Sequence, residues 1–209
     1  MTIQIFEAVE QGSEEWKRVR MGVPTASEFH AVMAKGEGKT RKSYMQRLAA
    51  EIVMGEPIET FKSAAMDRGN EMEPKARDMY CFMTDATPTR VGFIRNGQKG
   101  CSPDSLLGSA GILEIKTQRG DLLIETLLRD EFPTEHKAQC QGALWVAERE
   151  WVDIAVYWPR MPLFTRRAFR DDTYIARLSD AVDQFNDELA GMVERVKRYG
   201  MQPLAEAAE

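Results

Sequence analysis

The stretch Cys101-Ser-Pro-Asp-Ser-Leu-Leu-Gly-Ser-Ala-Gly-Ile-Leu-Glu-Ile-Lys-Thr-Gln118 decides how the fold is predicted. From Leu113 onward it alternates apolar and charged residues, which is the period of a half-buried strand and places Glu114 and Lys116 on one face. Pro103 removes a backbone donor and fixes φ, so we expect the chain to leave a strand there and present Asp104 at its end. The stretch predicts two short strands joined by a sharp bend.

Asp104 and Glu114 are predicted to lie close together and to bind a metal ion. Two carboxylates held side by side repel each other, and a hard divalent cation with oxygen ligands is the usual reason to place them so. Mg²⁺ fits this chemistry best. The metal would polarise a phosphoryl oxygen and lower the pKa of a bound water, while Lys116 would hold the water or offset negative charge. The pattern indicates phosphodiester hydrolysis, although an Asp followed by Glu-x-Lys occurs about once by chance in a chain of this length.

The composition is that of a soluble globular protein. The chain has 209 residues, a hydrophobic fraction of 43% and a charged fraction of 29%, which suits one domain with a full core. We expect a single domain over residues 1–200 and a frayed tail over 201–209. No apolar run is long enough to span a bilayer and the N-terminus has no signal-peptide pattern, so we expect a cytoplasmic protein without membrane partners.

The cysteines and histidines predict no metal centre of their own. Three widely spaced cysteines without a Cys-x-x-Cys motif indicate neither a disulfide framework nor a zinc or four-cysteine iron–sulfur site. We expect Cys81, Cys101 and Cys140 to be buried small residues. His30 and His136 are far apart in sequence and are interpreted as surface or packing residues.

The net charge of −5 does not by itself indicate a nucleic-acid-binding protein. Basic residues gather between positions 35 and 47, where a single acid, Glu37, accompanies Lys35, Lys39, Arg41, Lys42 and Arg47. Two interpretations stay open for this stretch: a solvated loop, or a loop that follows the phosphates of DNA.

Two helices are predicted near the N-terminus. Ser13 is a plausible N-cap for a short helix that ends in Arg18 and Arg20. Thr25-Ala26-Ser27-Glu28 has the spacing of a capping box and predicts a helix through about residue 34. Arg20 and Ser27 would then flank a helix N-terminus, where a phosphate can bind. The alternative is that the hydroxyls only cap the helix and Arg20 only pairs with a carboxylate.

The remaining periodicities predict an α/β domain with a mixed central sheet flanked by helices. Helices are expected at about 42–54, 64–83, 121–129, 134–148 and 171–199, and strands at 91–95, 151–158 and 163–169. Pro74 predicts a kink or a new first turn within the second of these helices. The last helix carries an apolar stripe from Ile175 to Val196, which we interpret as a helix covering the sheet rather than a coiled-coil seam.

Six sequence pieces in order carry a resemblance to a known family. They are Gln11-Gly12 followed by Trp16 and Arg20; Arg20-Met21-Gly22-Val23 before Thr25-Ala26-Ser27; Gly69 with Glu73; Ser102-Pro103-Asp104; Glu114-Ile115-Lys116; and Ala138-Gln139-Cys140-Gln141 followed by Leu144-Trp145-Val146. From about Gln11 to Trp158 the chain resembles the phage lambda exonuclease family, also called the YqaJ-like viral recombinase nucleases, within the restriction-endonuclease-like superfamily.

The resemblance implies a restriction-endonuclease-like core and a role for each matched residue. Asp104 and Glu114 would bind Mg²⁺, with Mn²⁺ as a substitute, and Lys116 would assist the attacking water. Glu73 and Gln139 would complete the site, and Arg20 and Ser27 would hold the 5′ phosphate of the substrate strand. The basic residues Arg18, Lys39, Arg41 and Lys42 would contact DNA.

The resemblance also implies an activity and partners. These are a magnesium-dependent 5′ to 3′ exonuclease that acts on the ends of linear double-stranded DNA, a ring-shaped homotrimer, and a single-strand annealing protein that takes the 3′ overhang in the cytoplasm of a bacterial host during phage-type recombination. The family's best-known member has a further acid where this chain reads Arg95-Asn96-Gly97, which leaves the second of two implied metal sites with fewer charges. Two other functions stay open: an endonuclease of the same fold, and a catalytically degenerate DNA-binding recombination factor.

Overall fold

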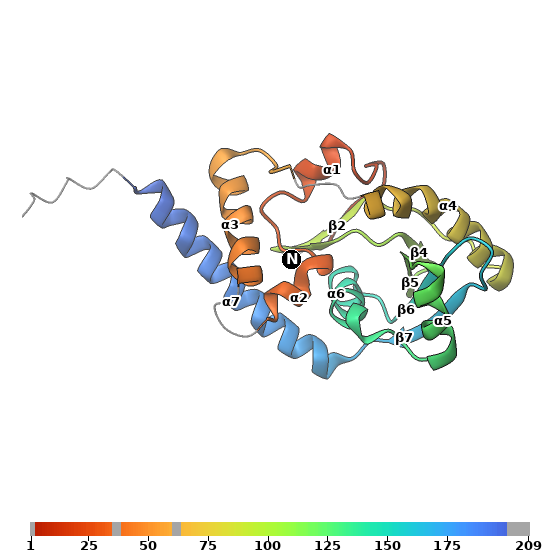
Figure 1. Cartoon of the computed structure of the whole chain (residues 1–209). Helices are drawn as coiled ribbons and strands as arrows, with labels where there is room; N and C mark the ends of the chain where they lie inside the picture. The colour runs from red at the N-terminus through yellow and green to blue at the C-terminus, as the bar shows by residue number, and fades with distance from the viewer. Residues whose placement is uncertain (1–2, 35–38, 60–63, 200–209) are drawn as a thin grey trace, which may run out of the picture.

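The computed structural model describes residues 3–34, 39–59 and 64–199. Within these ranges, helices and strands follow one another along the chain (Figure 1). The strands are β1 (Gln4–Phe6), β2 (Phe93–Asn96), β3 (Lys99–Cys101), β4 (Ser105–Leu107), β5 (Gly111–Thr117), β6 (Trp151–Tyr157) and β7 (Phe164–Phe169). The helices are α1 (Glu14–Val19), α2 (Phe29–Val32), α3 (Lys39–Met54), α4 (Ala64–Thr84), α5 (Gly120–Arg129), α6 (Lys137–Ala147) and α7 (Asp172–Lys197), with the short 3₁₀ helices η1 (Ala26–Glu28) and η2 (Thr134–His136).

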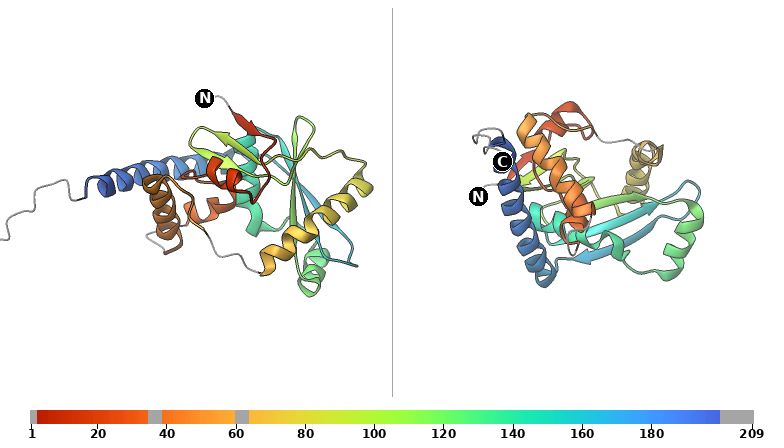
Figure 2. Two further views of the ribbon diagram at one scale, coloured as in Figure 1. Left: turned by 90° about the horizontal axis from the view of Figure 1, so that it is seen from above. Right: turned by 60° about the vertical axis from the view of Figure 1, so that its left-hand side comes forward.

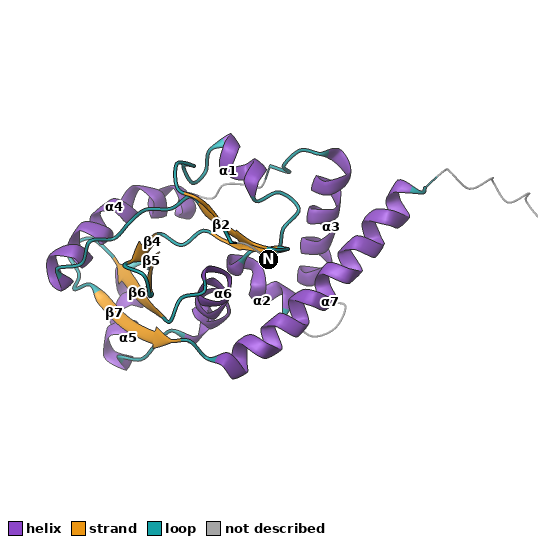
Figure 3. Ribbon diagram, turned by 180° about the vertical axis from the view of Figure 1, so that it is seen from behind, coloured by secondary structure: helices purple, strands orange, loops and turns teal. Residues whose placement is uncertain are grey.

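A mixed sheet with the strand order β4-β5-β6-β7 forms the centre of the fold. β4 and β5 pair antiparallel, β5 and β6 pair parallel, and β7 pairs antiparallel with β6. The parallel pair needs a long crossover, which α5, η2 and α6 provide. β6 is buried along almost its whole length, in keeping with its near-continuous apolar sequence. The predicted α/β class with a mixed central sheet is confirmed (Figure 3).

A second, three-stranded antiparallel sheet has the order β1-β2-β3. Asn96 pairs with Lys99, so the β2–β3 turn consists of Gly97 and Gln98, and Gly97 has the positive φ (63°) that such a turn favours. β3 also forms an isolated parallel bridge between Gly100 and Thr25. This bridge brings the chain that follows α1 next to the start of the Ser-Pro-Asp segment.

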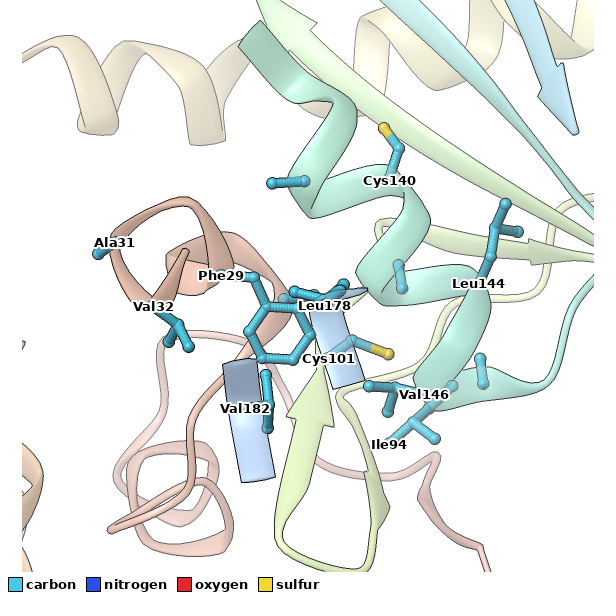
Figure 4. Packing of buried hydrophobic residues seen from close by; sticks show 14 of the residues in the cluster. Phe29, Ala31, Val32, Ile94, Cys101, Cys140, Leu144, Val146, Leu178 and Val182 are labelled. Atoms are coloured by element: carbon cyan, nitrogen blue, oxygen red, sulfur yellow. The ribbon is translucent and has the colours of Figure 1, made fainter. Parts of the chain in front are cut away.

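Helix α6 lies between the central sheet and the helices η1, α2 and α7. It contacts β2, β3, β5 and β6 on one side and η1, α2 and α7 on the other. Leu144 and Val146 of α6 pack with Phe29, Cys101 and Leu178 in the main core (Figure 4). A Cβ at Gly142 would lie 2.3 Å from Cδ2 of Phe29, so only glycine allows α2 to pack this closely on α6.

The prediction that the last helix covers the sheet is wrong. The buried stripe of α7, from Ile175 to Val193, packs chiefly against α3, α6 and α2. The reason is that α6 already occupies the face of the sheet on that side (Figures 1 and 2). The stripe ends at Val193, and Val196 is exposed. The tail predicted at 201–209 lies outside the described residues.

The predictions for Pro74 and for the three cysteines can also be compared with the structure. α4 continues from Ala64 to Thr84 with Pro74 inside it, so the proline does not begin a new helix. The cysteines are free, with Cys101 and Cys140 buried and Cys81 half-buried.

Candidate active site

The register of the β4–β5 hairpin places Asp104 opposite Glu114. Ser105 pairs with Leu113, and one step further along this antiparallel register Asp104 meets Glu114. Oδ2 of Asp104 accepts a hydrogen bond of 2.5 Å from the backbone N–H of Ile115, which ties the carboxylate to β5. Like charges directly opposite each other across two strands are destabilising, so the pairing requires compensation by positive charge.

Lys116 and Gln139 surround the Glu114 carboxylate, which is 3% exposed. Nζ of Lys116 lies 2.6 Å from Oε1 of Glu114 and donates to Oε1 of Gln139 at 3.0 Å. Nε2 of Gln139 donates to the same Glu114 oxygen at 2.5 Å. The side chains of Glu114 and Lys116 share one face of β5, as the alternation predicts, and α6 supplies Gln139 from above that face.

Burial and the charges of this cluster shift the pKa values of Asp104 and Lys116. Burial raises the pKa of Asp104, and the negative charges of Glu114 and Glu73 raise it further, to well above its usual value despite the opposing effect of Lys116. Burial alone would lower the pKa of Lys116, but Glu114 and Asp104 outweigh it and raise that pKa. Lys116 therefore stays charged, whereas Asp104 tends to keep its proton unless a further cation offsets the negative charge of its neighbours.

The donor set fits a hard divalent cation. Contacts among the described residues use Oδ2 of Asp104 and Oε1 of Glu114, which leaves Oδ1 and Oε2 as candidate ligand atoms. No group of three or more His, Cys, Asp or Glu side chains in the described part of the chain comes together as a ready-made metal cage. Mg²⁺ is commonly held by only one or two carboxylates together with waters and substrate phosphates, so two carboxylates suffice for such an ion.

Arg20 and Ser27 lie close together, but the predicted capping box does not form. Thr25 precedes the 3₁₀ helix η1 and its side chain makes no capping bond. Instead its hydroxyl lies 3.4 Å from Nη2 of Arg20 and 3.3 Å from the exposed hydroxyl of Ser27. The backbone N–H of Thr25 donates to the buried hydroxyl of Tyr44, which favours this arrangement over a capped helix.

Trp16 links this group to the Ser-Pro-Asp segment. The Arg20 guanidinium lies 4.0 Å from the centre of the Trp16 ring, a cation–π contact. Nε1 of Trp16 donates to the hydroxyl of Ser102 at 2.9 Å and to the carbonyl of Gly92 at 3.1 Å. The orientation of Arg20 is thereby fixed relative to Asp104, two residues after Ser102.

One cleft of about 480 Å³ contains both groups. Arg20, Ser27, Asp104, Glu114 and Lys116 all line it, together with Glu73 and Gln139. A wider groove of about 1310 Å³ opens beside the cleft and shares with it Trp16, Arg20, Ser27, Glu73 and Asp104. Residues predicted separately to bind phosphate and to perform hydrolysis therefore face the same space.

Arg77 is a residue that sequence reasoning missed. It lies one helical turn after Glu73 on α4 and forms an ion pair with that carboxylate. Its Nε donates to the hydroxyl of Ser105 at 3.1 Å, and its Nη2 donates to the carbonyl of Asp104 at 3.3 Å. The (i, i+4) Glu–Arg spacing was a signal for a pair, but the contact with the strand segment depends on the tertiary structure.

Comparison with known proteins identifies the family. The family model for the YqaJ-like viral recombinase domain matches residues 15–150.

The chain belongs to this family.

Solved structures agree with this assignment. The alkaline exonuclease LHK-Exo from Laribacter hongkongensis is 34% identical, and the match covers 90% of this chain and 98% of that chain with a TM-score of 0.83. LHK-Exo in complex with dAMP matches with 35% identity over 90% of this chain and 98% of that chain, with a TM-score of 0.84. A phage-related exonuclease from Haemophilus somnus, 14% identical over 86% of this chain and 99% of that chain with a TM-score of 0.64, shares the fold. No curated protein matches the chain in sequence.

The predicted family, fold class and enzyme class are confirmed by these likenesses. The protein is a nuclease of the lambda exonuclease type with a restriction-endonuclease-like core. Nucleases of this fold typically need a divalent metal ion, which agrees with the carboxylate pair described above.

The basic residues predicted to bind DNA differ from one another in their surroundings. Arg18 and Lys42 are exposed, so both are available to DNA. Arg41 instead contacts Glu188 of α7 through two hydrogen bonds of 2.5 and 3.1 Å, which fixes α3 on α7. Lys39 begins α3, but its side chain, like residues 35–38, lies outside the described part. Arg47, not assigned a role, lines the wider groove and pairs with Glu28.

None of the helices in the described ranges combines the length and the apolar character that a membrane span needs.

Proposed function

We propose that the protein is a magnesium-dependent 5′ to 3′ exonuclease that degrades one strand of linear double-stranded DNA and leaves 3′ overhangs for single-strand annealing recombination. The observation that carries this proposal is the single cleft in which Arg20 and Ser27 face the same space as Asp104, Glu114 and Lys116. A binding site for a terminal phosphate next to a hydrolytic site would select the 5′ end of a strand.

The carboxylates of Asp104 and Glu114 would hold the metal ion, Mg²⁺ or in its place Mn²⁺. When bound, such an ion polarises a phosphoryl oxygen and makes a bound water more acidic. Lys116, charged and already hydrogen-bonded to Glu114 and Gln139, would donate to the attacking water or to a phosphate oxygen. Gln139 would hold Lys116 and Glu114 in register, and Glu73 would contact water or the scissile phosphate from α4.

The reaction adds one water across a phosphodiester. The water oxygen bonds to phosphorus and loses a proton to solvent, and the bond from phosphorus to the 3′ oxygen of the terminal nucleotide breaks. That oxygen takes up a proton from solvent. The products are a nucleoside 5′-monophosphate and a strand with a new 5′ phosphate, which Arg20 and Ser27 can bind in the next cycle. The likeness to LHK-Exo, whose complex contains dAMP, supports a site that accepts a mononucleotide.

Digestion of end-labelled linear duplexes tests this function. We expect early release of the 5′ label in Mg²⁺, faster with a 5′ phosphate than with a 5′ hydroxyl, and no release with a chelator. Earlier loss of the 3′ label would show that the enzyme degrades the strand in the 3′ to 5′ direction. Nicking of closed circular DNA would indicate the endonuclease, and binding without cleavage would indicate the degenerate DNA-binding factor.

A ring-shaped homotrimer and a single-strand annealing partner complete the proposal. Family membership supports both. Light scattering of the purified protein tests the first, with a mass three times the 23.7 kDa of one chain as the expected result. Acceleration of strand annealing by a co-purified host or phage protein tests the second.

A further inference from the structure

Arg77 connects two candidate site residues but faces neither of the cavities that they line. Glu73 and Asp104 line both the cleft and the wider groove, whereas the described lining of these cavities does not include Arg77. The Arg77 side chain is 12% exposed and the Glu73 side chain 27% exposed. A cation in this position cannot serve mainly to attract DNA, because it is covered by the residues it contacts.

The contacts of Arg77 use the geometry that distinguishes arginine from lysine. Its guanidinium reaches three acceptors on two elements: the Glu73 carboxylate on α4, the Ser105 hydroxyl, and the Asp104 carbonyl ahead of β4. The hydroxyl of Ser105, which is fully buried, passes a further hydrogen bond of 2.6 Å to the same Asp104 carbonyl. The planar guanidinium holds its donors in a fixed geometry that satisfies all three acceptors at once. A lysine ammonium on a flexible side chain cannot hold the three acceptors in one equally fixed arrangement.

The remainder of α4 is held independently of Arg77. One turn further along the helix, the hydroxyl of Tyr80 donates to Asp153 of β6 at 2.6 Å, and Ala76 is fully buried. The loss of Arg77 would therefore leave α4 on the sheet and release only the local link between Glu73 and Asp104.

We propose that Arg77 is a positioning residue that holds the Glu73 carboxylate and the Asp104 backbone in one fixed arrangement, so that the carboxylates are preorganised for the metal ion and the scissile phosphate. This inference rests on the function proposed above. Removal of a residue that hydrogen-bonds to a metal ligand commonly lowers metal affinity or activity by about 10- to 100-fold. Arg77 acts through Glu73 and Asp104 and needs no contact with substrate.

The test compares Arg77→Met with Arg77→Lys, and with Arg129→Met as a matched control. Arg129 forms an exposed (i, i+4) pair with Glu125 on α5, so its removal breaks a pair of the same spacing away from the cleft. For Arg77→Met we expect kcat to fall about 10- to 100-fold with KM for DNA nearly unchanged, and the Mg²⁺ concentration for half-maximal activity to rise. For Arg77→Lys we expect values of kcat and of the half-maximal Mg²⁺ concentration between those of wild type and Arg77→Met. Arg129→Met should have wild-type values of both.

Metal binding is also measured without turnover, from the rise in Tm that Mg²⁺ or Mn²⁺ produces in each variant without DNA. We expect a smaller rise in Arg77→Met than in wild type, and a wild-type rise in Arg129→Met. An unchanged metal-induced rise together with an unchanged kcat would overturn the proposal, as would wild-type behaviour of Arg77→Lys on both counts. If wild type does not cleave DNA, the proposed function fails, while the thermal measurement still decides the role of Arg77. Should Arg77→Met fail to fold, Ser105→Ala removes one of the three acceptors and is expected to show a weaker effect in the same direction.

Discussion

Replacement of Lys116 by methionine separates catalysis from DNA binding. Lys116→Met keeps the length of the side chain and removes the ammonium that lies 2.6 Å from Glu114. If Lys116 acts on the attacking water or on charge that develops in the transition state, kcat should fall about 10²- to 10³-fold, the range found when one preorganised donor is lost. DNA affinity should stay nearly constant, because Arg20 and Ser27 are untouched.

The same variant should be less stable without metal. Removal of one partner from a buried ion pair typically costs about 3–5 kcal/mol. The Glu114 side chain is 4% exposed and the Lys116 side chain 25%, and Gln139 still donates to Glu114. We therefore expect a cost near the low end, about 3 kcal/mol, which lowers Tm by roughly 6–12 °C in a domain of this size. Mg²⁺ should restore much of the loss because it supplies positive charge at the same carboxylates.

Three measurements on one preparation decide this prediction. Single-turnover cleavage of a 5′-phosphorylated duplex gives the rate, fluorescence anisotropy of a labelled duplex gives the affinity, and thermal unfolding with EDTA or Mg²⁺ gives the stability. Arg129→Met is the control for loss of a positive charge elsewhere. Wild-type cleavage by Lys116→Met would refute the catalytic role, and a loss of DNA affinity equal to the loss of rate would refute its restriction to the transition state.

Three further predictions follow from the site and the core. Arg20→Gln should reduce the preference for 5′-phosphorylated over 5′-hydroxyl ends about tenfold to hundredfold, because a charge-assisted hydrogen bond is worth about 1.5–3 kcal/mol. Arg18 is exposed in the last turn of α1, just before the C-cap residue Arg20, and Arg18→Gln should keep the preference. The raised pKa of Asp104 means that the metal-free folded state binds its proton more tightly than the unfolded state, so this contribution to stability is full below about pH 3.9 and is lost as the pH rises through the folded pKa. The rise in Tm caused by Mg²⁺ should accordingly be larger at pH 8 than at pH 5, and equal shifts would contradict the assignment. Tyr80→Phe removes the 2.6 Å hydrogen bond to buried Asp153, which also accepts two hydrogen bonds of 2.8 and 2.9 Å from Arg167 of β7. The substitution should cost about 1.5–3 kcal/mol, measured by urea unfolding; an unchanged midpoint would show that Arg167 alone satisfies Asp153.

The elements that depend on short-range pattern were predictable from the sequence. The alternation in 113–116 places Glu114 and Lys116 on one face of β5 because successive side chains of a strand point to opposite sides. The α1 N-cap at Ser13 also agrees with the structure, and the strand predicted at 151–158 forms at Trp151–Tyr157. The capping box at Thr25 was wrong because the Thr25 N–H donates a tertiary hydrogen bond to the Tyr44 hydroxyl and the Thr25 side chain contacts Arg20 instead of capping the helix.

The amino-acid sequence establishes which reactive groups are present and the local geometry that presents each one. The helix N-terminus predicted at Thr25 pointed to Arg20 and Ser27, and family resemblance assigned site roles to Glu73 and Gln139. Neither gave the arrangement of these residues. Only the tertiary structure decided that these residues share one cleft with Glu114, that Arg77 joins α4 to the Asp104 segment, and that α7 packs on helices rather than on the sheet. The physical reason is that periodicity and capping act within a few residues of the chain, whereas these contacts join distant segments whose relative position is set by the packing of the whole core around α6.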